Sequence, residues 1–252
     1  MVPTELLAHA VVWAALLEAM PLGALVRNLG AMTRVGLLAT GSDAARTVAA
    51  RLGDGAAIAR ARVHPLALLV AMKTYAQGNR MRGARAGTGW TPVAGVVDAL
   101  DGAFHLAFGN VPSTGKRVLL ALDVSGSMGA PVHGLPFVSC REASAAMALV
   151  TAAVEPARRI VAFTAGTSRS MWPDYPTGLS ELAISPRQRL DDVVRHTAAL
   201  PLGGTDCALP MVEAARNGWA VDLFVLYTDH ETWAGNVHPA QALRAYRERE
   251  LA

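Results

Sequence analysis

Two runs of almost uninterrupted apolar residues, each followed or ended by an aspartate, constrain the fold of this chain most strongly. The runs are VLLALD at 118–123 and LFVLYTD at 223–229. Runs of this length are typical of parallel strands buried on both faces, and helical patterns separate them along the chain. Strands that alternate with helices predict a doubly wound α/β sheet, whose ligands bind beyond the carboxyl ends of the strands. We therefore expect Asp123 and Asp229 at two such ends.

The same pattern predicts the remaining elements of the second half. The expected strands are 117–123, 159–164 and 222–228, with a further short strand near 171–172. The expected helices are 141–154, 186–200, 207–217 and 239–250.

The first half of the chain has a different pattern. Apolar residues recur at helical spacing and no strand-like alternation of useful length is found, which predicts an all-helical segment. The expected helices are 6–20, 22–32, 42–52, 65–77 and 92–108, with Pro21, Ser42 and Thr91 at three of their starts. Such helices are expected to pack in pairs as in a solenoid, although no repeat of fixed period is visible.

Turn residues mark a boundary between the halves at 109–116, GNVPSTGK. The segment is not a phosphate-binding P-loop, because five residues separate Gly109 from Gly115 and the glycines precede the strand. The predicted domains are therefore residues 1–116 and residues 117–252.

Oxygen-bearing side chains gather in the loops that follow the predicted strands. Asp123, Ser125 and Ser127 occupy alternate positions after one strand, Thr205 lies in a GGTD loop, and Asp229 ends another strand. Carboxylate and hydroxyl oxygens suit a hard cation, Mg²⁺ first, with Mn²⁺ or Ca²⁺ as substitutes. A capped turn would explain Asp-x-Ser-x-Ser alone, but the three loops together predict a metal site.

The charge of the chain is unevenly distributed. Apolar residues make up 52% of the sequence and charged residues 17%, which predicts a globular protein. The net charge is +3, yet residues 1–116 hold eleven Lys and Arg against six Asp and Glu, whereas residues 117–252 hold twelve against fourteen. A basic half favours a polyanionic partner.

A loop at 78–89 carries part of this basic charge, with Arg80, Arg82 and Arg85 among glycines. The loop either contacts phosphates or merely keeps the protein soluble.

The sequence also bears on the cellular compartment. The apolar stretch 6–26 is interrupted by His9, Glu18 and Pro21, so we expect a buried helix and no membrane association. The N-terminus lacks the pattern of a signal peptide, so we expect a cytoplasmic protein. Cys140 and Cys207 fit neither a metal motif nor a disulfide framework and are expected to be small buried residues.

Several longer segments resemble a known family over nearly the whole chain. They are MPLGALVRNLG, HPLALLVAMKTY with RMRG after it, TGKRVLLALDVSGSM, PLGGTDCALPM and LYTDHETWAGNVHPAQALRAYR. The second half resembles the von Willebrand factor A superfamily with its metal-ion-dependent adhesion site. The whole chain resembles the TROVE proteins of the Ro ribonucleoprotein family, in which HEAT-like helical repeats are joined to an A-type domain. Against that family the chain looks truncated at both ends.

The resemblance implies a non-enzymatic RNA-binding protein. It implies that the helical half grips small structured RNAs of the Y RNA type, with a role in RNA quality control, and that the metal site recruits an acidic protein ligand. The candidate RNA contacts, expected to share one face, are Arg27, Lys73, Arg80, Arg82, Arg85 and Lys116. A rival hypothesis is a metal-dependent protein interaction module that binds no RNA. Hydrolysis by metal-bound water ranks third, because no base converges with Asp123.

Overall fold

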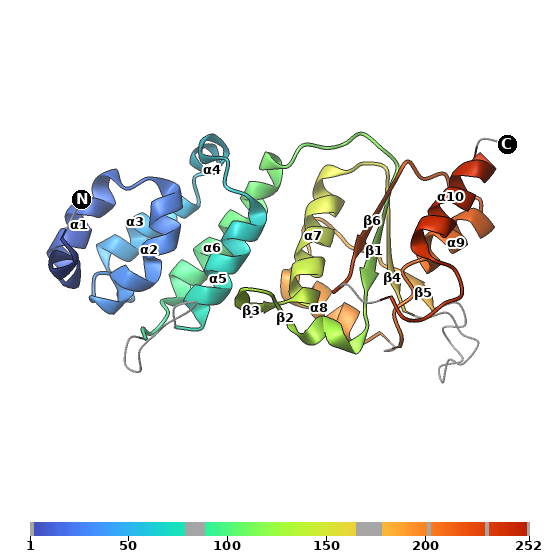
Figure 1. Cartoon of the computed structure of the whole chain (residues 1–252). Coiled ribbons are helices and arrows are strands. Elements are labelled where there is room, and N and C mark those ends of the chain that lie inside the picture. The colour runs from blue at the N-terminus through green and yellow to red at the C-terminus, as the bar shows by residue number, and fades with distance from the viewer. Residues whose placement is uncertain (1–2, 79–88, 165–177, 201–202, 230–231, 251–252) are drawn as a thin grey trace. The chain divides into compact units, whose positions relative to one another are not determined.

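The computed structural model describes residues 3–78, 89–164, 178–200, 203–229 and 232–250 (Figure 1). The chain divides into two compact units. The first comprises Met1–Pro112 with Leu135–Val138, and the second comprises Ser113–Gly134 with Ser139–Ala252.

The described residues before Pro112 form helices and no strand, which confirms the all-helical prediction. The α-helices are α1 Ala10–Ala19, α2 Leu22–Arg34, α3 Asp43–Leu52, α4 Gly55–Ala61, α5 Pro65–Ala76 and α6 Ala94–Leu106, and two short 3-10 helices are Thr4–Ala8 and Ala107–Asn110. The predicted helix 6–20 is therefore wrong as a single element, because the chain is extended at His9. Helix α4 was not predicted; it is seven residues long, and the Asp54 carboxylate accepts the Ala57 N–H at 2.9 Å to cap it.

The two predicted hydroxyl caps differ in outcome. The Ser42 hydroxyl accepts the Ala45 N–H at 3.1 Å, as predicted, and stabilises the first turn of α3. Thr91 does not cap the last helix of this unit. Helix α6 begins at Ala94, and the Val93 N–H before it donates to the Tyr75 hydroxyl at 3.2 Å.

The core of the helical unit lies where α5 packs against α6 and α6 against α3. Fully buried side chains from α2, α5 and α6 fill it, among them Leu25, Leu29, Met32, Leu68, Leu69, Leu100 and Phe104. Burial of such side chains stabilises the unit by about 1.5–3 kcal/mol each relative to exposure.

The rest of the chain alternates strands and helices. The strands are β1 Val118–Asp123, β2 Pro131–Val132, β3 Leu135–Ser139, β4 Arg158–Phe163, β5 Leu179–Glu181 and β6 Leu223–Tyr227. The α-helices are α7 Cys140–Val154, α8 Leu190–Ala198, α9 Leu209–Arg216 and α10 Pro239–Glu250, and a 3-10 turn spans Gly126–Gly129. The predicted strand near 171–172 lies outside the described residues, and β2, β3 and β5 were not predicted.

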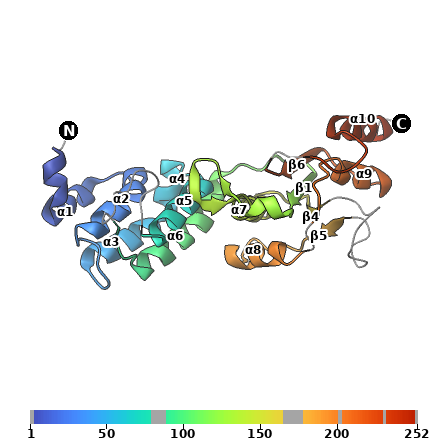
Figure 2. The ribbon, with the colours of Figure 1, turned by 60° about the horizontal axis from the view of Figure 1, so that its bottom comes forward.

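The main sheet has the strand order β5-β4-β1-β6. Strand β1 is parallel to both β4 and β6, and β5 adds an antiparallel edge. Helices α7 and α8 lie on one face, and α9 and α10 lie on the other (Figure 2). This confirms the α/β class, and it places the ends of β1 and β6 side by side, with Leu122 opposite Tyr227.

Burial differs between the two apolar strands. Every residue of β1 is buried, as predicted for a strand with neighbours on both sides. The prediction that the run ending at Asp229 is equally buried is wrong, because β6 is partly exposed along its length and Leu223 is 37% exposed. The described strands lie on one side of β6 only, so it is an edge strand.

Across the described residues, no single helix is both long and apolar enough to cross a membrane. The pair Gly55–Ala61 and Pro65–Ala76, bent by 112°, meets the criterion on length and composition alone.

Candidate functional site

Asp123 is the centre of a cluster of loops at one end of the sheet. It ends β1 and is 1% exposed. Its Oδ1 accepts the Ser125 N–H at 2.8 Å, and its Oδ2 accepts the hydroxyls of Thr228 at 2.9 Å and Thr205 at 3.4 Å. Three loops that are remote in sequence therefore meet at one carboxylate.

The two predicted serines lie on the loop that follows β1. Their hydroxyl oxygens are 3.0 Å apart, with Ser125 buried and Ser127 exposed. The Ser125 carbonyl accepts a hydrogen bond from Arg141 Nη2 at 3.1 Å, which ties this loop to the first turn of α7. The two hydroxyls therefore lie in a fixed loop beside Asp123, and one of them reaches the surface.

Asp229 is the fifth predicted ligand, and it directly follows Thr228. Its Oδ1 is buried and has no hydrogen-bond partner among the residues that the structure describes. A buried carboxylate oxygen without a partner is costly, and a bound cation would remove that cost. The residues present therefore fit a cation that is held by oxygen ligands.

The donor atoms decide which kind of cation the cluster suits. The described part of the chain holds no group of three His, Cys, Asp or Glu residues placed to bind a metal, so a cation bound here would need the hydroxyls as ligands. Cys207 lies nearby, and burial raises the pKa of its thiol above the ordinary value. Oxygen ligands alone favour Mg²⁺ or another hard cation.

Trp233 lies beside this cluster, and nothing in the sequence pattern marked it as part of the site. Its backbone N–H and that of Ala234 donate to the Thr205 carbonyl at 3.2 and 3.1 Å. Its ring packs on Gly204, where a Cβ would lie 2.8 Å from the Cη2 atom. Trp233 is nevertheless 71% exposed, so an exposed aromatic surface adjoins Thr205.

Asp206 is the acidic residue of the GGTD loop, and it has a structural role. Its Oδ1 accepts the Ala208 N–H at 2.9 Å at the start of α9. Burial raises the pKa of this carboxyl, and the N–H groups of Ala208 and Leu209 oppose the rise only in part. The carboxylate also packs on Gly235, whose φ of +88° favours glycine.

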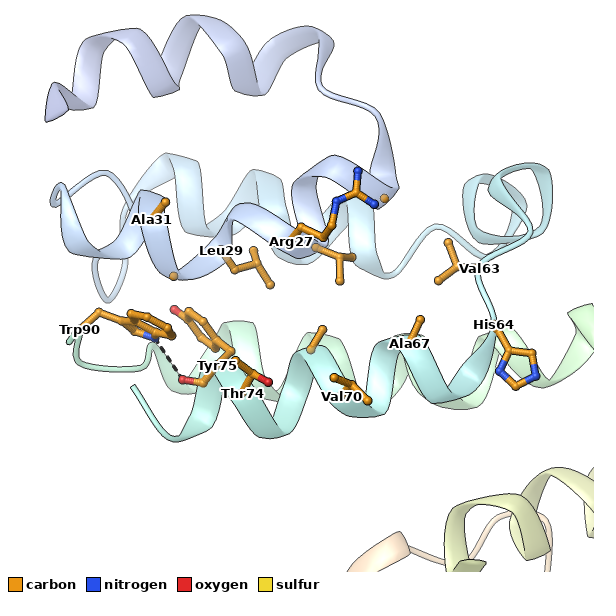
Figure 3. A pocket seen from close by; sticks show the side chains of 14 residues that line it. Arg27, Leu29, Ala31, Val63, His64, Ala67, Val70, Thr74, Tyr75 and Trp90 are labelled. Carbon is orange, nitrogen blue, oxygen red and sulfur yellow. Dashed lines mark hydrogen bonds between the residues drawn. The ribbon is translucent and has the colours of Figure 1, made fainter. Parts of the chain in front are cut away.

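The predicted RNA contacts are only partly described. Arg27 is exposed on α2, where it lines a groove of about 530 Å³ (Figure 3). Lys73 is half-buried on α5 and is not among the described residues that line this groove. Lys116 is exposed in the second unit, whereas Arg80, Arg82 and Arg85 lie outside the described residues. A shared basic face therefore stays a prediction.

The fold and the loop cluster define the class of protein. An α/β domain with Asp-x-Ser-x-Ser after its first strand, preceded by helices, is the arrangement expected for an A-type domain joined to helical repeats. Family models agree: the Ro60 vWA domain matches residues 117–251, and the TROVE domain matches residues 1–74. The chain therefore belongs to the Ro60 family.

Individual relatives match nearly the whole chain. The RNA-binding protein RO60 of Deinococcus radiodurans is 44% identical over 250 residues, covering 98% of this chain and 44% of that protein. RNA-binding protein RO60 of Caenorhabditis elegans is 41% identical over 249 residues, covering 98% and 36%. The crystal structure of the Deinococcus radiodurans RO (RSR) protein superposes with a TM-score of 0.86 at 42% identity, covering 100% of this chain and 48% of that one. The chain thus spans less than half the length of these relatives.

Proposed function

We propose that this chain binds RNA through its helical unit and a divalent cation through the loop cluster around Asp123. The observation that carries the RNA proposal is the match of nearly the whole chain to two proteins that are named as RNA-binding. The excess of eleven Lys and Arg over six Asp and Glu in residues 1–116 supports it, because phosphate contacts dominate affinity for nucleic acids.

The residues proposed to hold the cation are Asp123, Ser125, Ser127, Thr205 and Asp229. Bound there, Mg²⁺ would supply positive charge able to attract an acidic side chain of a partner protein. The chain's own contribution is to orient the ligands: Thr205 is held by the N–H groups of Trp233 and Ala234, and Ser125 by Arg141. This role requires no acid–base pair, so we propose binding without catalysis.

Small structured RNAs of the Y RNA type are the proposed RNA class, with a role in RNA quality control. The chain spans less than half the length of the relatives it matches. This RNA class and this role are therefore proposed for the chain itself. A labelled structured RNA, titrated by fluorescence anisotropy at several salt concentrations, tests it. We expect saturable binding that weakens as salt rises, by about 0.7–0.9 log units per log unit of salt for each phosphate contact. An RNA affinity too weak to saturate at low salt would contradict the proposal.

Metal and RNA sites are proposed to be independent. Repeating the titration with EDTA at constant ionic strength should leave RNA affinity unchanged, because the acidic ligands lie in the second unit and the basic excess lies in the first. RNA binding that disappears with the chelator would show that a cation links the protein to phosphate.

A metal-dependent protein interaction module without RNA binding is the second candidate. The exposed indole of Trp233 beside Thr205 favours it, because exposed aromatic residues that are held in place are common anchors of interfaces. It predicts Mg²⁺-dependent capture of an acidic peptide together with no RNA affinity at any salt concentration.

A further inference from the structure

The groove between α2 and α5 is walled mainly by apolar residues. Helix α2 contributes Leu29 and Gly30, helix α5 contributes Val70 and Thr74, and Trp90 closes one end (Figure 3). Its volume of about 530 Å³ lies in the range of sites that bind small organic groups. The groove lies wholly within the helical unit, so its shape is set by that unit alone.

The aromatic end of the groove is rigid. The Trp90 indole N–H donates to the Tyr75 carbonyl at 3.1 Å, and the two rings are nearly parallel, with centroids 6.1 Å apart. The indole also covers Gly30, where a Cβ would lie 2.6 Å from its ring. The Tyr75 hydroxyl is bonded to Thr33 at 2.9 Å and to the Val93 N–H. A flat aromatic wall held in this way needs no reordering to receive a ligand.

The Thr74 hydroxyl favours a ligand that carries a polar group. Its hydroxyl oxygen is buried and has no hydrogen-bond partner within the described ranges. An aliphatic side chain in the groove would leave that hydroxyl unsatisfied, at a cost in binding. A planar ring with apolar faces and a polar edge would fill the groove and also bond to the hydroxyl. Nucleobases have this combination.

Charge at the rim points to the same ligand. Arg27 is exposed at the groove, with its Nη1 atom 3.7 Å from where a Cβ on Gly23 would lie. A base in the groove could place its phosphate near the Arg27 guanidinium.

We infer that the groove between α2 and α5 receives one unpaired nucleobase of the RNA. The inference rests on the proposed RNA binding and adds a preference for unpaired over paired nucleotides. Its probes are a fluorescein-labelled hairpin RNA with an unpaired loop and a blunt RNA duplex of equal charge.

Filling the groove is the first test. Ala67 is exposed, lines the groove and lies on α5, so Ala67→Phe should occupy the space without overpacking the core. Ala76→Phe on the same helix, exposed and outside the groove lining, is the matched control. We expect Ala67→Phe to weaken hairpin binding about tenfold or more, with the duplex unchanged and Ala76→Phe equal to wild type. Circular dichroism and melting temperature establish that both variants are folded.

Removing the hydroxyl is the second test, and it decides the matter if Ala67→Phe does not fold. Thr74→Val keeps the shape of the side chain and should weaken hairpin binding about 2- to 10-fold without lowering the melting temperature. Thr74→Ser keeps the hydroxyl and should restore most of the affinity.

The outcomes separate this inference from the proposed function. Wild-type hairpin affinity in both Ala67→Phe and Thr74→Val would overturn the base pocket while RNA binding stands. An equal loss on hairpin and duplex would also overturn it, because a base pocket cannot act on paired nucleotides. A wild-type chain that binds neither RNA would overturn both proposals. A change of oligomeric state in Ala67→Phe, with hairpin affinity intact, would instead assign the groove to a second copy of the chain.

Discussion

The Thr205 carbonyl accepts the backbone N–H of Trp233 at 3.2 Å, and this bond joins the backbone of a proposed metal ligand to that of a residue on another loop whose aromatic side chain is exposed. The Trp233 ring also packs against Gly204, the residue before Thr205. The two loops therefore stabilise each other's positions. A substitution in one loop should alter the position of the other.

Gly204→Ala should lower the affinity for Mg²⁺. The new Cβ would lie 2.8 Å from the Trp233 ring and 3.1 Å from the Ala234 Cβ, so the ring and the loop that carries Ala234 must shift away from Gly204, and we expect this shift to displace Thr205. Titration calorimetry should show at least about a tenfold loss, the scale seen when groups that orient metal ligands are removed. Gly129→Ala, where a Cβ meets nothing within 4 Å, is the control and should bind as wild type. Equal affinity in both variants would mean that Thr205 is not positioned by this contact.

The two aspartates of the cluster should differ in their effect on stability. Asp123→Ala removes the acceptor of three hydrogen bonds, so it should abolish Mg²⁺ binding and cost about 1–3 kcal/mol of folding free energy without metal. Asp229→Asn should also abolish Mg²⁺ binding, but it should leave stability unchanged or slightly raised, because Asp229 Oδ1 has no partner within the described residues. Thermal melts in EDTA distinguish the two. A metal-free Asp229→Asn variant that melts well below wild type would show that Asp229 has a structural role.

Glu155 should make stability depend on pH. It is 5% exposed, and it accepts the Thr114 N–H at 2.7 Å and the Ser113 hydroxyl at 2.9 Å. Burial acts to raise the pKa of Glu155, but these hydrogen bonds outweigh it and lower the pKa below its ordinary value of 4.5. The ionised group therefore stabilises the fold above the unfolded-state pKa, and this contribution is lost as the pH falls through the lower folded-state pKa.

The Glu155→Gln variant checks the sign of this effect. It should be about 1–3 kcal/mol less stable than wild type at pH 7, since a neutral amide replaces a charged acceptor in two hydrogen bonds. Melting temperatures measured from pH 7 down to about pH 3 should converge as Glu155 becomes protonated in the wild type. A gap that stays constant over this range would rule out the ionised form as the stabilising one.

The arginines of the segment after α5 should bind phosphates rather than base edges. Replacing Arg80, Arg82 and Arg85 with alanine should weaken binding about equally for different RNAs. It should also reduce the slope of log affinity against log salt by about 0.7 for each phosphate of single-stranded RNA that is no longer neutralised. The triple lysine variant, which keeps the charge, should retain the slope. An unchanged slope in the alanine variant would mean that these arginines do not bind phosphate.

Local chemistry explains what could be predicted from the sequence. Ser42 signals the start of α3, because a hydroxyl at that position bonds the first turn. Apolar strands that are followed by polar residues bring Asp123 and Thr228 together. Helix α4 was missed because seven residues beginning with glycine show too little periodicity. The half-buried state of β6 was missed because its sequence does not reveal how many neighbouring strands it has.

Contacts between residues that are far apart along the chain could not be predicted from local sequence patterns. The packing of Trp233 on Gly204 depends on how two loops approach, and neither residue type indicates the other. At the start of α6, the Tyr75 hydroxyl from another helix bonds the backbone where Thr91 was the expected cap. The groove between α2 and α5 likewise arises from helix packing, so the presence of Trp90 and Arg27 in the sequence did not predict it.

The placement of two tryptophans provides the protein with optical reporters of its own. Trp90 lines the groove of the helical unit, and Trp233 lies exposed beside Thr205 in the other unit. Replacing Trp233 with phenylalanine should leave an emission change on RNA addition and remove one on Mg²⁺ addition, and replacing Trp90 should do the reverse. Intrinsic fluorescence of the two variants can therefore follow each unit separately, without a chemical label.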